Sequence, residues 1–358
     1  MQALVTGFPS RKATAVVERL LLEGHQVSVL AREPAAVTRL LGARDGMRVY
    51  AGEPWAIDFG LSAKEYAELS ANTTHVFHVP NARLGSGQAE ATRDCVSATR
   101  EALNFFRQLG PDARLLHVST VLALRELEGV ATEDMEADPS NHRSQVLRAY
   151  ARAERMVDQD KSERSFIVRT GIAFGDAVTG DFEPGSWGHV LAAFVLSSPE
   201  DLPLPIPVPD DSTLNLVSTD FLARAVVAIG TSPLFGGRRH FHVVDSKPYD
   251  ARRVLELVAT AAGRPQLRYS MPAPIWKALW RAPLVGMAAG RGRAHVVEGL
   301  LGSSVYDNAN ARAVIGELAD ACPDFKDYVA PVVQRMKEHR RAGRNLLDAG
   351  LSDDDIPG

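Results

Sequence analysis

The fold is decided near the start of the chain by Thr6-Gly7-Phe8-Pro9-Ser10-Arg11-Lys12-Ala13, which joins an apolar run to a helical pattern. A dinucleotide-binding turn has three small residues at this spacing. The first permits a tight turn, the second lets the backbone approach a pyrophosphate, and the third lets the helix pack on the strand. Gly7 and Ala13 suit the first and third positions. Ser10 occupies the second, so its side chain either fills the space of closest approach or binds a phosphate through its hydroxyl.

Positive charge surrounds this turn. Arg11 and Lys12 open the helix, where free backbone N–H groups and the helix dipole favour anions. Arg32 ends the next predicted strand, where an NAD site has an acidic residue for the ribose hydroxyls. Arginine suits a 2′-phosphate, so the sequence favours NADP(H) over NAD. The competing interpretation is an empty loop with a solvated surface arginine.

Apolar runs and helical patterns alternate along the first half of the chain. This order predicts an α/β fold with a Rossmann-type, doubly wound parallel sheet of six strands. Strands are expected at residues 2–6, 26–30, 48–51, 74–79, 114–119 and 165–169, and helices at 15–23, 88–109 and 144–159. After Gly175, proline and glycine become frequent. We therefore expect a dinucleotide-binding domain at 1–175, a mainly substrate-binding region with some segments returning to the sheet at 176–338, and a polar tail at 339–358.

The composition narrows the class of protein. A net charge of −4 over 358 residues gives no electrostatic footprint for nucleic acid. Two cysteines cannot form a disulfide framework, and they indicate free thiols in a reducing compartment. A strand pattern at the first residues leaves no room for a signal peptide, and no apolar run reaches the roughly 18 residues of a membrane span. We expect a cytoplasmic protein with no membrane span and no metal site.

Several further motifs extend the pattern, and together the chain resembles the extended short-chain dehydrogenase/reductases, also called the NAD-dependent epimerase/dehydratase superfamily. The resemblance runs from residue 1 to about residue 335 and is strongest to the fatty acyl and thioester reductase branch. It rests on Thr6-Gly7, Val118-Ser119-Thr120, Ala153-Glu154-Arg155-Met156-Val157, Arg169-Thr170-Gly171 and Leu214-Asn215-Leu216-Val217. The resemblance implies that Thr120, with Ser119 beside it, orients a substrate carbonyl or hydroxyl. It also places His78 and Thr170 at the cofactor.

The catalytic helix departs from the family. Such enzymes use a Tyr and, four residues later, a Lys that lowers the Tyr pKa; this spacing puts both on one helix face. Alignment on Glu154 puts Val146 at the Tyr position and Tyr150 at the Lys position. If Tyr150 is taken as the catalytic Tyr, Glu154 falls at the Lys position, where a carboxylate would raise the Tyr pKa. Pro80 also stands where small residues normally pass beneath the cofactor.

Three functions remain open. The first is an atypical NADP(H)-dependent oxidoreductase of biosynthetic metabolism, acting on a hydrophobic acyl or polyketide-like carbonyl or hydroxyl compound. There Thr120 polarises the substrate and Tyr150 donates the proton. The second is a non-redox cyclase, dehydratase or isomerase on the same scaffold. Its candidate acid and base groups are His117, His142, Asp176, Asp181 and His189. The third is a binding or regulatory protein that has lost the chemistry.

The predicted partner is a hydrophobic small molecule. Residues 272–289 carry an apolar helical face with basic residues beside it. This segment is either a lid over an acyl chain, a membrane-surface contact or a core helix. A homodimer formed through the active-site helix is an implication of the family resemblance alone.

Overall fold

The computed structural model describes residues 1–83, 86–124, 129–142, 144–197, 212–264 and 305–341. Its centre is a parallel seven-stranded sheet in the order β11-β7-β5-β4-β1-β2-β3. The strands are β1 (Gln2–Val5), β2 (Gln26–Ala31), β3 (Met47–Ala51), β4 (His75–His78), β5 (Arg114–Thr120), β7 (Ser165–Thr170) and β11 (His240–Val243). Strand order reverses between β1 and β4, which is the point where doubly wound sheets bind ligands.

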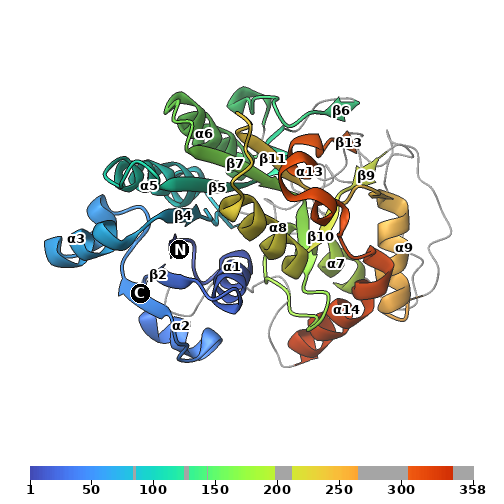
Figure 1. Cartoon of the computed structure of the whole chain (residues 1–358). Helices are drawn as coiled ribbons and strands as arrows, with labels where there is room; N and C mark the ends of the chain where they lie inside the picture. The colour runs from blue at the N-terminus through green and yellow to red at the C-terminus, as the bar shows by residue number, and fades with distance from the viewer. Residues whose placement is uncertain (84–85, 125–128, 143, 198–211, 265–304, 342–358) are drawn as a thin grey trace.

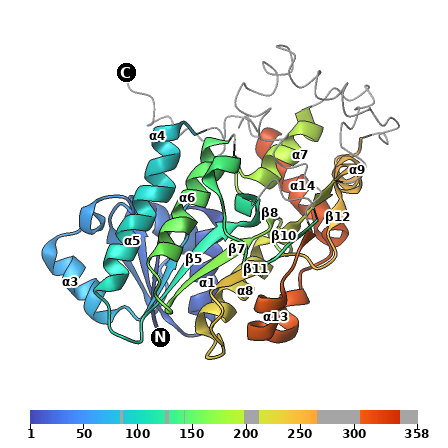
Figure 2. The ribbon, with the colours of Figure 1, turned by 90° about the horizontal axis from the view of Figure 1, so that it is seen from above.

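Helices cover both faces of this sheet (Figures 1 and 2). One face packs on α1 (Arg11–Leu22), α2 (Pro34–Leu41) and α8 (Thr219–Thr231). The other packs on α3 (Ala63–Asn72), α5 (Ala98–Arg107) and α6 (Gln145–Gln159). Because successive strand residues point to opposite faces, strands buried on both sides are apolar almost throughout. The Rossmann-type α/β fold predicted from the sequence is confirmed.

Three details of the prediction were wrong. The sheet has seven strands, because β11 returns from the C-terminal half and pairs with β7, with His240 opposite Ile167. The helix predicted at 15–23 begins four residues earlier, because Ser10 caps it. The helix predicted at 88–109 consists of α4 (Gln88–Ala91), a π-helical turn (Thr92–Ser97) and α5.

A second apolar cluster lies beyond the carboxyl ends of the central strands (Figure 2). Its elements are β8 (Ile172–Gly175), α7 (Trp187–Ser197), β9 (Thr213–Leu214), β10 (Leu216–Ser218), β12 (Tyr249–Asp250), α9 (Ala251–Ala261) and α14 (Phe325–Arg341). The other short elements are η1 (Ile57–Gly60), η3 (Val121–Leu124), β6 (Val130–Ala131), η4 (Pro139–Asn141), β13 (Val305–Tyr306), α13 (Ala309–Ile315) and η5 (Gly316–Asp320). The apolar segment at 272–289 and most of the tail lie outside the described residues. None of the described helices is long and apolar enough to cross a membrane.

A buried ion pair joins α6 to the sheet. Arg169 of β7 and Glu154 of α6 are 0% and 1% exposed, and Arg169 Nε lies 2.9 Å from Glu154 Oε2. Arg169 Nη1 also donates to the Glu133 carbonyl at 2.9 Å. Removal of either charge leaves the other in a medium that cannot solvate it.

We expect Glu154→Gln to lower the free energy of unfolding by about 3–5 kcal/mol, because it leaves the Arg169 charge uncompensated. Urea unfolding measures the loss. The matched control is Arg155→Ala on the same helix, where the side chain is 49% exposed and 3.9 Å from Asp138. This control should cost about 1 kcal/mol or less. Equal effects of the two substitutions would contradict the prediction.

Candidate active site

The loop between β1 and α1 is held against the end of β4. Gly7 has φ +88°, and a Cβ placed on it would lie 1.8 Å from the Val79 carbonyl oxygen. Thr6 N donates to the Phe77 carbonyl at 3.1 Å on the same side. Only glycine fits this approach, so Gly7 fixes where α1 begins relative to the neighbouring strand.

A cavity of about 450 Å³ opens beside this loop. Its walls come from the carboxyl ends of β1, β2 and β4 and from the start of the π-helical turn and α5. The lining residues are Thr6, Gly7, Phe8, Pro9, Arg32, Pro54, Trp55, His78, Val79, Pro80, Asn81, Arg83, Glu90, Arg93, Asp94 and Ala98. Of the predicted cofactor residues, the structure gathers Gly7, Arg32 and His78 here.

Arginine and carboxylate side chains both line this cavity, and Arg93 Nε donates to Asp94 Oδ1 at 2.7 Å. The Arg32 side chain is 66% exposed, and its Nε lies 3.6 Å from Glu53 Oε1. The Arg93 guanidinium lies over the Trp55 ring, 4.5 Å from its centre. Such a weak, exposed pair leaves Arg32 available to an anionic ligand.

Ser10 is the N-cap of α1. Its Oγ accepts a hydrogen bond from Ala13 N at 3.2 Å, and the residue is 1% exposed. The hydroxyl therefore satisfies a first-turn amide of the helix and does not fill the groove. Ala13 is fully buried in the core between α1 and the sheet.

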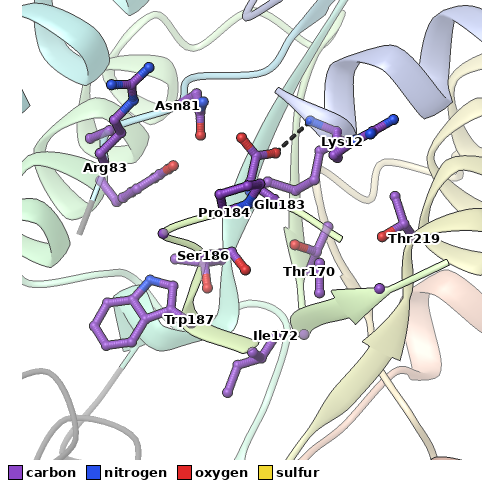
Figure 3. Close-up of a pocket in the computed structure, with 18 residues that line it drawn as sticks. Lys12, Asn81, Arg83, Thr170, Ile172, Glu183, Pro184, Ser186, Trp187 and Thr219 are labelled. Carbon is purple, nitrogen blue, oxygen red and sulfur yellow. Dashed lines mark hydrogen bonds between the residues drawn. The ribbon is translucent and has the colours of Figure 1, made fainter. Parts of the chain in front are cut away.

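A carboxylate occupies the anion position at the start of α1. Glu183, from the loop between β8 and α7, accepts a hydrogen bond from Arg11 N at 2.5 Å (Figure 3). The Arg11 side chain lies 3.5 Å from Asp181. Sequence reasoning missed Glu183, because 172 residues separate it from Arg11.

Glu183 and Lys12 carry opposite pKa shifts. Burial raises the pKa of Glu183, while the Arg11 amide and Lys12 act in the other direction. Burial lowers the pKa of Lys12, opposed by the charge of Glu183. No hydrogen bond or ion pair of the Lys12 ammonium is found within the described part of the chain. Both residues are half-buried, and partly buried groups shifted in this way are typical of functional sites.

A smaller cavity of about 70 Å³ lies between this pair and the ends of β5 and β7. Its lining residues are Arg11, Lys12, Asn81, Ala82, Arg83, Thr120, Tyr150, Thr170, Gly171, Ile172, Ala173, Gly175, Glu183, Pro184, Gly185, Ser186, Trp187 and Thr219. The structure thus brings Thr120, Tyr150 and Thr170 together with Lys12 and Glu183.

The hydroxyls at the strand ends differ in availability. Thr120 and Thr170 are register partners on β5 and β7. Thr120 Oγ1 accepts from Leu122 N at 3.3 Å, whereas Thr170 Oγ1 donates to the Ser119 carbonyl at 3.1 Å. Ser119 is fully buried, does not line the cavity, and alternates with Thr120 to the other face of the sheet. Thr120 therefore keeps a hydroxyl proton for a ligand.

Tyr150 is hydrogen-bonded to the segment that follows β4. Its hydroxyl donates to the Pro80 carbonyl at 2.9 Å, and burial raises its pKa well above the ordinary value. Glu154 pairs with Arg169 instead of acting on Tyr150, so the expected effect of that carboxylate is not the cause of the shift. Val146, at the other candidate Tyr position, is a buried core residue.

The candidate histidines lie in the protein interior. His78 Nδ1 lies 2.7 Å from Thr6 Oγ1 and its Nε2 lies 3.0 Å from Thr99 Oγ1, which joins β1, β4 and α5. His117, His142 and His189 are all buried. None of the five residues suggested for non-redox chemistry lines the smaller cavity. No cluster of potential metal ligands occurs among the described residues.

Comparison with known proteins places the chain in a family. A model of the male sterility protein family, a type of NAD-binding domain, matches residues 11–226. No curated protein sequence matches. The terminal R domain of the myxalamid PKS-NRPS biosynthetic pathway is similar in structure, with a TM-score of 0.76, 17% identity, and coverage of 95% of this chain and 91% of that one.

Two further solved structures share the fold. A thiolation-reductase di-domain from an archaeal non-ribosomal peptide synthetase has a TM-score of 0.68 and 12% identity. The match covers 95% of this chain and 76% of that one. UDP-glucuronic acid 4-epimerase from Bacillus cereus, solved with NAD, has a TM-score of 0.65 and 13% identity, with coverage of 95% and 98%. The fold is that of the extended short-chain dehydrogenase/reductases, as the sequence motifs predicted.

The buried state of His78 predicts a loss of stability in acid. Burial lowers its pKa from 6.5 to about 3, so below pH 6.5 the unfolded chain binds a proton that the folded imidazole does not. Between pH 6.5 and about 3 this residue alone should reduce the free energy of unfolding by about 1.4 kcal/mol per pH unit. His78→Gln should flatten the dependence measured by urea unfolding. An unchanged slope would contradict this assignment.

Proposed function

The chain belongs to the male sterility protein family, and we propose that it is an NADP(H)-dependent oxidoreductase of the extended short-chain dehydrogenase/reductase type. The observation that carries the proposal is the arginine-lined cavity beside Gly7, at the reversal of strand order. Its volume and its opening along β1 and β2 fit the adenosine half of a dinucleotide. Arg32 would hold the 2′-phosphate, and the Arg11 amide would hold the pyrophosphate once Glu183 leaves it. When bound, the cofactor supplies or accepts the hydride.

The substrate in this proposal is a hydrophobic carbonyl or hydroxyl compound of acyl or polyketide type. Trp187 and Ile172 give the smaller cavity an apolar wall (Figure 3). Thr120 also lines this cavity, and in the proposal its hydroxyl orients the substrate carbonyl. The reductase domains with the same fold act as a fold-level analogy in favour of such substrates. For Tyr150 to donate a proton, its hydroxyl must exchange the Pro80 carbonyl for the substrate.

A second candidate is a non-redox enzyme on the same scaffold. Lys12 and Glu183 favour it, because an ammonium with a lowered pKa and a carboxyl with a raised pKa are suited to proton transfer. These two residues replace the histidines and aspartates suggested by the sequence. The two functions are distinguished by nucleotide binding.

Titration with NADPH and NADH by calorimetry tests the cofactor. We expect NADPH to bind more tightly than NADH, and Arg32→Ala to weaken NADPH by about tenfold because the 2′-phosphate loses a charge-assisted hydrogen bond. NADH, which lacks this phosphate, is the matched control and should be affected by less than about threefold. If neither nucleotide binds the protein, with or without the Glu183 carboxylate, the oxidoreductase proposal is wrong.

Replacement of Thr120 tests the substrate site. We expect Thr120→Val to reduce the turnover of a medium-chain aldehyde with NADPH by about 10²–10³-fold, because a donor to the carbonyl oxygen is lost. Thr120→Ser keeps the hydroxyl and should retain most of the rate. Turnover is followed by the decrease in NADPH absorbance. Unchanged turnover in Thr120→Val would remove Thr120 from the mechanism.

A further inference from the structure

The N-terminus of α1 holds an internal ligand. This position in a Rossmann-type fold binds phosphate, because first-turn N–H groups and the helix dipole attract negative charge. Here Glu183 Oε2 accepts the Arg11 N–H at 2.5 Å. The carboxylate thus makes the charge-assisted hydrogen bond that a pyrophosphate oxygen would make.

The loop that presents Glu183 is braced by hydrogen bonds on both sides. Asp176 N donates to the Asp181 carbonyl at 2.8 Å, and Asp176 Oδ1 accepts from Thr179 N at the same distance. Beyond Glu183, Gly185 N donates to His189 Nδ1 at 2.9 Å, and the Phe182 and His189 rings are 5.1 Å apart. A folded turn therefore delivers the carboxylate to α1.

Two anions cannot share the amide. A dinucleotide that places its pyrophosphate at the start of α1 brings like charge to within contact of Glu183, in a partly buried place where screening is weak. Lys12 lies close enough to interact with Glu183 electrostatically and stays in the cavity when that carboxylate leaves. The exchange would replace one counterion of Lys12 by another.

We propose that Glu183 is a built-in competitor for the pyrophosphate position, which a dinucleotide must displace to bind. The inference rests on the proposed function and deepens it, since it names the residue that sets dinucleotide affinity. A ligand confined to the adenosine cavity does not meet Glu183. The competition therefore weakens NADPH and spares adenosine 2′-monophosphate, which carries the same 2′-phosphate and has no 5′-phosphate to place at the start of α1.

The test compares these two ligands by calorimetry on the wild-type protein and on Glu183→Gln. The amide is nearly isosteric with the carboxylate and removes its charge. We expect Glu183→Gln to increase the affinity for NADPH by about tenfold or more and to change the affinity for adenosine 2′-monophosphate by less than about twofold. Glu183→Ala, as a second variant, should give the same difference.

Asp181→Asn is the matched control. It removes one charge from the same loop without touching the Arg11 amide, since Asp181 pairs with the Arg11 and Arg335 side chains at 3.5 and 3.6 Å. We expect it to change NADPH affinity by less than about twofold, because partly exposed pairs are weak. If Asp181→Asn increased NADPH affinity as much as Glu183→Gln, the gain would come from the loss of any negative charge in this loop, and the proposal would be overturned.

The remaining outcomes separate the two ideas. Equal NADPH affinity of the wild-type protein and Glu183→Gln overturns the competition and leaves the proposed function standing. Failure of both ligands to bind any variant overturns the proposed function, and the competition with it. Independently of nucleotides, amide hydrogen exchange should show the Arg11 N–H protected in the wild-type protein and exposed in Glu183→Ala. Equal exchange in both would refute the internal ligand itself.

Discussion

The contact between Gly7 and the Val79 carbonyl is the constraint on which the site depends. Because no side chain fits between them, the β1–α1 loop lies directly against the end of β4. This fixes the start of α1 at the reversal of strand order, with the larger cavity on one side and the strand-five hydroxyls on the other. It also fixes the segment from Val79 onward, whose Pro80 carbonyl then accepts the Tyr150 hydroxyl.

The charged residues around α1 differ in how far burial affects them. On the outside, Arg11, Asp181 and Arg335 form partly exposed pairs that contribute little free energy. On the inside, Lys12 and Glu183 are held where burial opposes their charged forms, and each lessens the effect of burial on the other. A polar pair maintained in this way is costly unless it binds something or moves a proton. That cost makes the inner pair the more informative one about function.

The sequence was sufficient for most of the fold and for only part of the site. Strands β1 to β5 and β7 followed from apolar runs between helical patterns. Later segments were expected to return to the sheet, but β11 is short and lies 70 residues beyond β7, so no local pattern identified it as the strand that pairs with β7. Gly7, Arg32 and His78 could be grouped because they end neighbouring parallel strands. Glu183 could not, since its place depends on how a distant loop folds back. The sequence left Ser10 as either a phosphate contact or an obstruction in the turn, whereas its spacing to Ala13 also suits the N-cap that the structure shows.

The loss of the Tyr/Lys pair and the presence of Glu183 have a common physical consequence. In neither alignment of the active-site helix does a Lys stand four residues after a Tyr: the Lys position carries Tyr150, whose hydroxyl donates to backbone, or Glu154, which pairs with Arg169. The positive charge of this region comes instead from Lys12 on α1, and Glu183 neutralises it across the cavity. A ligand in the smaller cavity would meet an ammonium and a carboxylate on the α1 side and the Thr120 hydroxyl on the β5 side.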